Sequence, residues 1–250
     1  MSGHSKWANI KHKKAAVDAK KGKLWSRLSK AIIIAARTGS DPSMNPRLRL
    51  AIDAAKAVSM PRDNIERAIR RGSGESSDGA SMEEILYEGY GSSGTAVICE
   101  IVTDNRNRTA PEIRKIFESG GGKLGATNCV AWMFDRKGLF VIEADKIEED
   151  ALMELALEAN AEDVSRNGDV FEVLCLPEDF SVVAEALEKA GVPIVEAEIS
   201  RIPQNQVEIT DLEAAKKILR MMDRLEEHDD VQAVFSNYTI ADALMEQLEE

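Results

Sequence analysis

The residues whose types suggest chemistry gather at the start of the chain. The first 30 residues, MSGHSKWANIKHKKAAVDAKKGKLWSRLSK, hold nine Lys or Arg and a single acid, Asp18, which gives the segment a charge of +8. Cations neutralise phosphates and release counterions, so this density indicates polyanion binding. Trp7 lies among the cations, where its ring either stacks on an exposed base or anchors the segment to the protein's own core.

The basic residues follow no strict one-face period, which favours an arm that wraps its target over a helix that reads a groove. In TDNRNRT, Arg106 and Arg108 flank the start of a predicted helix, where free N–H groups favour an anion such as phosphate. A polar turn whose arginines pair with nearby acids explains this stretch equally well. The candidate nucleic-acid-binding residues are His4, Lys6, Trp7, Lys11, His12, Lys13, Lys14, Lys20, Lys21, Lys23, Arg27, Arg47, Arg49, Arg70, Arg71, Arg106 and Arg108.

Charge is divided unevenly along the chain, whose net charge is −12. Residues 1–74 hold 17 basic and five acidic residues, which gives +12. The remaining residues hold 15 basic and 39 acidic residues, which gives −24. We expect the first part to attract polyanions and the rest to repel them, except where basic groups gather locally. A helical surface that is basic only for solubility is the weaker alternative.

Signals for catalysis or metal binding are absent or out of context. The three histidines lack ligand spacing, and the acidic clusters, Asp229-Asp230 among them, fall on or beside amphipathic helices as solvated faces. GYGSSG at 89–94 fits G-x-G-x-x-G but precedes a strand, which predicts a tight turn entering a sheet. SGGGKLG at 119–125 lacks the Ser or Thr of a phosphate loop and reads as a helix stop. We expect no enzymatic activity, no cofactor and no metal.

Class and compartment follow from composition. A chain of 250 residues is long enough for two or three domains. It has no apolar run near the ~18–20 residues that span a membrane, and no apolar segment behind its basic start. Cys99, Cys129 and Cys175 are odd in number and lie in strand-like runs, as buried thiols do in a reducing compartment. We expect a cytoplasmic protein with no membrane contact.

The first part of the chain is typical of helices. In KLWSRLSKAIIIAARTG, Leu24, Leu28 and Ile32 recur on one stripe before a Thr38–Gly39 stop. Asn45-Pro46 then provides an N-cap and a helix-starting proline, and a third helix runs from Pro61 to Gly72. GSGESSDGA at 72–80 is the best linker in the chain.

Strands and helices alternate in the rest. The helix at 109–121 begins with a capping-box pair, Thr109 and Glu112. Segments 138–203 follow the order β-α-β-β-α-β of a ferredoxin-like unit. Predicted strands at 95–104 and 129–134, with a helix between them, join QVEIT, a long helix and VQAVFSNYT in a second such unit. We therefore expect an α+β fold with three domains: residues 1–74, residues 81–134 with 206–240, and an inserted domain at 135–205.

Four motifs in order resemble the YebC family: GHSKWANIKHKK, NPRLRLAIDAAKAVSMPRDNIERAI, YEGYGSSGTA and TDNRNRTAPEIRKIF. The resemblance runs over essentially the whole chain. Ser92-Ser93 stands where the family usually has Pro-Gly, and Asn128-Cys129 where Gly-Ser is common. Both departures bear on loop geometry rather than membership.

The resemblance implies a helical N-terminal domain and two α/β domains, one interrupted by the other. It implies a transcriptional regulator that binds promoter DNA. Mitochondrial relatives act as translational activators, and some members act on ribosomes stalled at proline runs, so ribosomal RNA is the alternative partner. Because the chain starts at the first motif, with no presequence, a bacterial protein is expected. The basic arm and the missing groove-reading motif favour structured RNA on physical grounds. An acidic protein-docking scaffold and an enzyme using an interdomain cleft are further alternatives.

Overall fold

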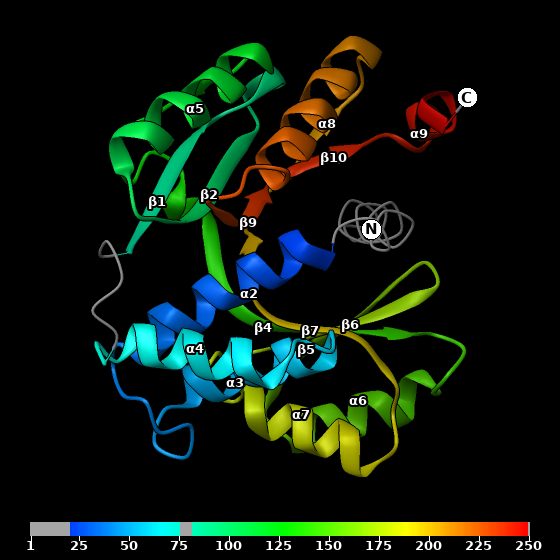
Figure 1. Ribbon diagram of the computed structural model, residues 1–250. Helices are drawn as coiled ribbons and strands as arrows, with labels where there is room; N and C mark the ends of the chain where they lie inside the picture. Colours follow the sequence, from blue (N-terminus) through cyan, green and yellow to red (C-terminus); the bar gives the residue numbers. More distant parts are fainter. Residues whose placement is uncertain (1–20, 76–81, 250) are drawn as a thin grey trace. The chain divides into compact units, whose positions relative to one another are not determined.

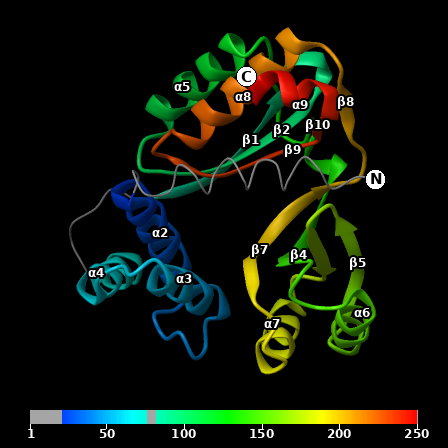
Figure 2. The same ribbon diagram turned by 90° about the vertical axis from the view of Figure 1, so that its right-hand side faces the viewer.

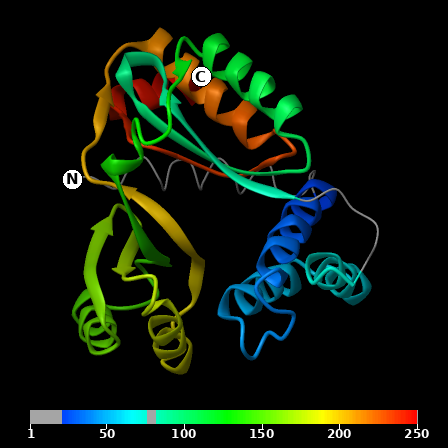
Figure 3. The same ribbon diagram turned by 90° about the vertical axis from the view of Figure 1, so that its left-hand side faces the viewer.

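The computed structural model describes residues 21–75 and 82–249, shown in three views in Figures 1, 2 and 3. The described chain forms two compact units, one of residues 21–131 with 210–236 and the other of residues 132–209 with 237–249. Within the described residues, no helix combines the length and apolar character that crossing a membrane requires. The domain boundaries expected from the sequence stay a prediction.

Three helices form the first part of the larger unit, as expected: α2 (Lys21–Ala36), α3 (Pro46–Ala57) and α4 (Arg62–Gly72). Asn45 caps α3, because its side chain accepts a hydrogen bond from the Leu48 backbone N–H. The predicted cap and proline start of this helix are therefore confirmed.

Close approach of α4 to α2 depends on a glycine. A Cβ at Gly72 would lie 2.3 Å from the Ile33 carbonyl oxygen and 2.7 Å from the Ala36 Cβ. The core between the helices is built from Ile32, Ala35 and Leu48, none of which is exposed. Apolar residues of α2, α3 and α4 thus share one core, which leaves their polar faces outward.

A four-stranded antiparallel sheet, here called the outer sheet, belongs to the same unit. Its strand order is β3-β1-β2-β9, and α5 and α8 lie on one of its faces (Figures 1 and 3). Its elements are β1 (Glu83–Tyr90), β2 (Ala96–Thr103), α5 (Arg106–Ser119), β3 (Lys123–Leu124), α8 (Leu212–Glu226) and β9 (Val231–Ser236).

The turn between β1 and β2 contains the glycine motif and matches its expected role. A 3₁₀ turn, Ser92–Gly94, connects the strands, and Gly91 N–H donates to the Thr95 carbonyl at 2.8 Å. Ser92 Oγ, at one of the family departures, donates to the Ala214 carbonyl at 3.0 Å and so ties the turn to α8. The motif forms a hairpin turn and precedes a strand.

The strand predicted at 129–134 is wrong. Asn128 adopts φ 63°, and a short 3₁₀ helix, η3 (Ala131–Met133), occupies the segment. Backbone N–H groups of Asn128, Val130 and Ala131 donate to the Glu88 carboxylate at 2.7, 3.0 and 2.7 Å. Donors held by a buried side chain are not available to a strand ladder, so the segment becomes a loop.

The second sheet, here called the inserted sheet, confirms the βαββαβ order. Its antiparallel strand order is β5-β6-β4-β7, and α6 and α7 pack on one face (Figure 2). Its elements are β4 (Phe134–Glu143), α6 (Glu149–Glu158), β5 (Ala161–Asn167), β6 (Val170–Cys175), α7 (Phe180–Lys189) and β7 (Ile194–Pro203). Phe140 of the sheet stacks on Phe180 of α7 with ring centroids 4.7 Å apart.

A parallel pair of short strands closes the fold. β8 (Val207–Ile209), which begins in the predicted QVEIT strand, pairs with β10 (Tyr238–Ile240) rather than with the outer sheet, and α9 (Asp242–Glu249) follows. β1 lies in the outer sheet, where the sequence predicted the strands at 129–134 and at QVEIT instead. The α+β class, with a helical N-terminal part and one α/β part inserted in the other, is confirmed.

Candidate nucleic-acid interface

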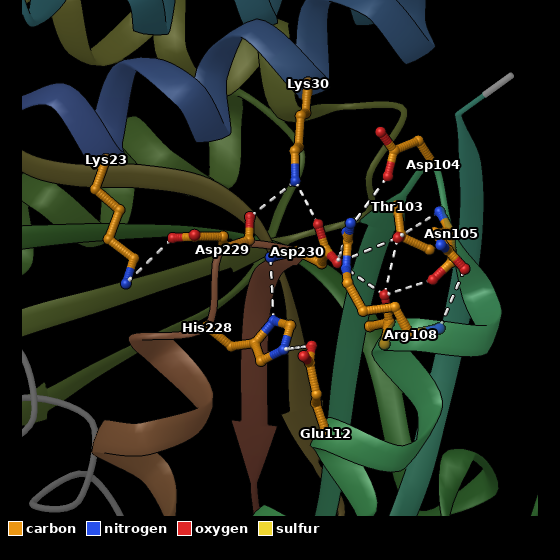
Figure 4. Close-up of polar contacts among 11 residues, drawn as sticks. Lys23, Lys30, Thr103, Asp104, Asn105, Arg108, Glu112, His228, Asp229 and Asp230 are labelled. Carbon is orange, nitrogen blue, oxygen red and sulfur yellow. Dashed lines mark hydrogen bonds and ion pairs between the residues drawn. The ribbon is translucent and has the colours of Figure 1, made fainter. Parts of the chain in front are cut away.

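Basic residues of α2 face the C-terminal end of α8 rather than solvent (Figure 4). Lys30 Nζ donates to the Asp229 carbonyl at 2.9 Å, and Lys23 Nζ lies 3.6 Å from the Asp229 carboxylate. Arg27 donates to the Glu226 carbonyl. The last carbonyls of a helix carry partial negative charge, so Arg27 stabilises the end of α8, while Lys23 and Lys30 hold the residues just beyond it.

Asp230 is the centre of a buried polar cluster (Figure 4). Its carboxylate accepts from Lys30 Nζ at 2.7 Å, from Arg108 Nη2 at 2.7 Å and from Thr109 Oγ1 at 2.7 Å. Thr103 Oγ1 lies 3.1 Å from the same carboxylate. The sequence interpretation of Asp229-Asp230 as solvated acids is wrong for Asp230, whose side chain is only 4% exposed.

Burial and charge act in opposite directions in this cluster. Burial disfavours the charged carboxylate of Asp230, but hydrogen bonds from Lys30, Arg108 and Thr109 outweigh burial and hold its pKa well below the usual range. Burial lowers the pKa of Arg27, although Glu226 and Asp229 oppose that shift. The cluster therefore holds a charged carboxylate in the protein interior by surrounding it with donors.

His228 extends the cluster towards α5. Its Nδ1 accepts from the Asp230 backbone N–H at 3.1 Å, and its Nε2 lies 3.0 Å from Glu112 Oε2. An accepting Nδ1 carries no proton, so the hydrogen bond assigns the proton to Nε2, which donates to Glu112. The histidine thus joins the end of α8 to the first half of α5.

The two arginines of TDNRNRT differ: one pairs with the protein's own acids, and the other stays exposed, as an anion-binding residue would. Arg108 pairs with Asp230 and with Asp104 at 3.3 Å, so it serves the protein's own acids. Arg106 is exposed and forms no ion pair with the described residues. The helix begins earlier than predicted, because Asn105 caps α5 by accepting from Arg108 N–H at 3.1 Å. The Thr109–Glu112 capping box is therefore wrong, and Thr109 lies buried within the helix.

The helical part, which consists of α2, α3 and α4, has several arginines at its surface. Arg47 pairs with Glu84 of β1, whereas Arg49 of α3 is exposed and pairs with no acid among the described residues. On α4, Arg67 and Arg70 are exposed. Of the predicted residues in this part, Arg49, Arg70 and Arg71 have side chains that no described acid holds.

Eight of the predicted residues of the arm lie outside the described part of the chain. Lys21 is the first residue of α2. The predicted residues outside the described part of the chain are His4, Lys6, Trp7, Lys11, His12, Lys13, Lys14 and Lys20.

Among the described residues, the buried carboxylate of Glu88 and the buried thiols of Cys99 and Cys175 lie in surroundings that do not activate them. The Glu88 carboxylate is fully engaged by three backbone N–H groups. Burial raises the pKa of the Cys175 thiol to about 11, and Cys99 is likewise buried, which makes both poor nucleophiles at neutral pH. Among the described residues, no group of three or more His, Cys, Asp and Glu side chains is placed to hold a metal ion.

Sequence reasoning missed Lys30 and Asp230, and it did not single out the cations of α8. Lys30 lies on the α2 helix among other lysines, and nothing in its spacing distinguishes an internal partner from a solvated one. The one available signal was Thr103 and Thr109 on either side of DNRNR, since two hydroxyls there supply donors for a buried acid.

Comparison with known proteins places the whole chain in one family. The family model described as "TACO1/YebC protein N-terminal domain" matches residues 5–75, and "TACO1/YebC second and third domain" matches residues 82–238. Proteins named "Probable transcriptional regulatory protein" from Dictyoglomus turgidum and Desulfitobacterium hafniense are each 53% identical over 250 residues, covering 99% of this chain and 100% and 99% of theirs.

A solved structure supports the same assignment. The crystal structure of the conserved hypothetical protein Aq1575 from Aquifex aeolicus matches with a TM-score of 0.85 and 48% identity, covering 95% of this chain and 98% of that one. Sequence and fold agree along nearly the full length. The chain belongs to the TACO1/YebC family.

Proposed function

We propose that this protein is a non-enzymatic regulator of gene expression that binds nucleic acid, with promoter DNA as its target. The observation that carries the proposal is the charge of the helical part: residues 21–74 hold 12 basic and four acidic residues, a net charge of +8. The names of the relatives point the same way, because they describe transcriptional regulation. Lysine and arginine side chains on a folded surface bind the phosphate backbone.

The connection between α3 and α4 is short and leaves the cations of α4 at the surface. A four-residue turn at 58–61, with Ser59 at φ 57°, joins the two helices. Ile65 and Ala68 point α4's apolar side into the core, so Arg67, Arg70 and Arg71 are left on its outer side.

A charge-reversal series tests the proposal. Arg67→Glu combined with Arg70→Glu is expected to weaken binding to duplex DNA at least tenfold, since two phosphate contacts become repulsive. Lys146→Glu combined with Lys189→Glu changes the net charge equally, on the inserted part, and is expected to leave binding near that of the unaltered chain. Fluorescence anisotropy at several salt concentrations measures both. An unaltered chain that binds no duplex in dilute buffer would overturn the proposal.

The arm is tested separately. Changing Lys11, Lys13 and Lys14 to Glu is expected to weaken binding to all sequences alike and to flatten its salt dependence, because phosphate contacts carry no sequence information. A loss confined to one sequence would contradict a backbone-binding role for the arm.

Ribosomal RNA is the alternative target, and the same titration decides between them. Binding to a structured RNA hairpin at least tenfold tighter than to duplex DNA would favour a translation factor. Retention of a protein partner by residues 82–249 after removal of the helical part would instead favour the acidic scaffold.

A further inference from the structure

The α5 and α8 helices of the outer sheet lie antiparallel, side by side (Figures 1 and 3). Glu112, in the first half of α5, contacts His228 just beyond the end of α8. Ser119, at the end of α5, accepts a hydrogen bond from Arg224, and a Cβ at Gly121 would lie 3.6 Å from Lys217. One stripe of each helix therefore faces the other along their common length.

Basic residues occupy these facing stripes. Lys115 lies on the α5 stripe of Glu112 and Ser119, at spacings of three and four residues. Lys217, Arg220 and Arg224 recur on α8 at spacings of three and four, on the side that contacts the end of α5. We call this set of four cations the α5–α8 seam: Lys115, Lys217, Arg220 and Arg224.

The seam is basic within a part of the chain that is acidic overall. Helices α5 and α8 hold eight basic and five acidic residues, a net charge of +3. Residues 75–250 as a whole carry −24. The sequence expectation that this part repels polyanions made an exception for local basic groups, and the seam is such a group.

The seam cations are exposed and mostly uncommitted. Lys115, Lys217 and Arg220 are exposed and form no ion pair with an acid among the described residues. Arg106 and Arg114 of α5 share both properties. This differs from Arg27 and Lys30 of α2, which donate hydrogen bonds to carbonyls at and just beyond the end of α8. Exposed, unengaged cations on two rigid helices are ready to bind an anion without breaking internal contacts.

Composition favours nucleic acid over an acidic protein. Protein interfaces centre on exposed aromatic and large apolar side chains. The exposed large apolar side chains of the described chain lie elsewhere than α5 and α8: Met44, Leu50, Trp132, Met153, Leu157, Leu176 and Val182. A surface that offers arginines and lysines without an apolar centre matches a phosphate backbone.

We propose that the α5–α8 seam is a second nucleic-acid-binding surface, which contacts the phosphate backbone of the duplex bound by the helical part. The inference rests on the proposed function and adds a site to it. Each seam cation neutralises a phosphate, so the seam strengthens binding to all sequences alike.

The test neutralises three seam cations at once: Lys115→Gln, Lys217→Gln and Arg220→Gln. Because all three side chains are exposed, the fold is expected to survive, and circular dichroism with a thermal melt checks this. The matched control is Arg136→Gln, Lys146→Gln and Lys189→Gln, three exposed cations of the inserted part. Fluorescence anisotropy measures affinity for one DNA duplex and one RNA hairpin across a salt series.

The seam variant is expected to bind the duplex at least tenfold more weakly near 0.1 M salt, and to reduce the salt slope by about two to three phosphate contacts, while the control stays unchanged. If the seam variant binds like the unaltered chain while the Arg67→Glu, Arg70→Glu variant is weakened, the inference fails and the proposed function stands. If the unaltered chain binds neither probe, both fail. If a polyglutamate peptide binds through the seam and the duplex does not, an acidic protein partner replaces this proposal.

Discussion

The outer and inserted sheets have similar architecture and opposite surfaces. Each is a four-stranded antiparallel sheet with two helices on one face. The outer pair, α5 and α8, holds eight basic and five acidic residues, whereas the inserted pair, α6 and α7, holds one basic and six acidic residues. Met153, Leu157 and Val182 are exposed on the inserted pair, and no large apolar side chain is exposed on the outer pair.

A shared architecture therefore leaves the helix surfaces free to diverge. Only the core-facing stripe of each helix is constrained by packing, and the other positions accept any charge. We infer that the outer pair serves an anionic partner.

The two regions also differ in what stabilises them. The inserted region depends on an apolar core centred on Phe140 and Phe180. The outer region adds a buried carboxylate, Asp230, with donors from Lys30, Arg108 and Thr109. Apolar packing and the polar cluster can therefore be perturbed separately, one in each region.

The largest effect is expected from Phe140→Ala. Phe140 is fully buried and stacked on Phe180, so its removal loses apolar contacts and leaves a cavity that costs about 3–5 kcal/mol. Hydrogen exchange is expected to accelerate in β4, β6 and α7 and to change little in β1 and β2. Chemical denaturation followed by hydrogen-exchange mass spectrometry measures both. Equal acceleration in the two regions would contradict separate stabilisation.

The next largest effect is expected from Asp230→Asn. Removing the charge leaves Lys30 and Arg108 without their shared carboxylate, and breaking one partner of a buried pair costs about 3 kcal/mol. Asp229→Asn is the control, because its side chain is 86% exposed and its loss is expected to cost under ~0.5 kcal/mol. Urea denaturation measures the two. Similar losses would show that burial of Asp230 contributes nothing.

Stability is expected to depend on pH through the same residue. The pKa of Asp230 is lower in the folded than in the unfolded chain, so its stabilisation is present above the unfolded value near ~3.9 and is lost as the pH falls. The free energy of unfolding should therefore decline below about pH 4, and this decline should be shallower in Asp230→Asn. Denaturation at pH 3, 4 and 7 tests the difference. Identical slopes in both proteins would exclude Asp230 as a source.

Sequence patterning predicted elements whose signals are local. The helix start at Asn45-Pro46, the glycine turn before β2 and the βαββαβ order of the inserted sheet each follow from spacing or turn residues close together in the chain. The same holds for the excess of cations at the start, which composition alone reveals. For the candidate site, the sequence could predict which basic residues take part, but it could not predict which residues they contact.

The features that were missed depend on residues far apart in the sequence. Asp230 looks like a surface acid until Lys30, 200 residues away, and Arg108 converge on it. The loop at 128–131 has strand-like apolar residues, but Glu88, 40 or more positions earlier, takes its backbone donors. β1 carries four polar or glycine positions in EEILYEGY without clear alternation, so its pairing with β2 and β3 only emerges in the folded sheet.

The smallest effect is expected from making the inserted helices resemble the outer ones. Glu154→Lys with Glu158→Lys places two cations four residues apart on the exposed side of α6. The new lysines attract any polyanion, but the rest of the inserted region stays acidic and repels it. The gain in duplex affinity is therefore expected to be about threefold, which is smaller than the loss expected from the seam variant. Anisotropy at low and moderate salt measures the gain, with Glu154→Gln, Glu158→Gln as the control for lost repulsion. A gain of tenfold or more would mean that charge alone creates the affinity, and that the paired geometry of α5 and α8 adds nothing to it.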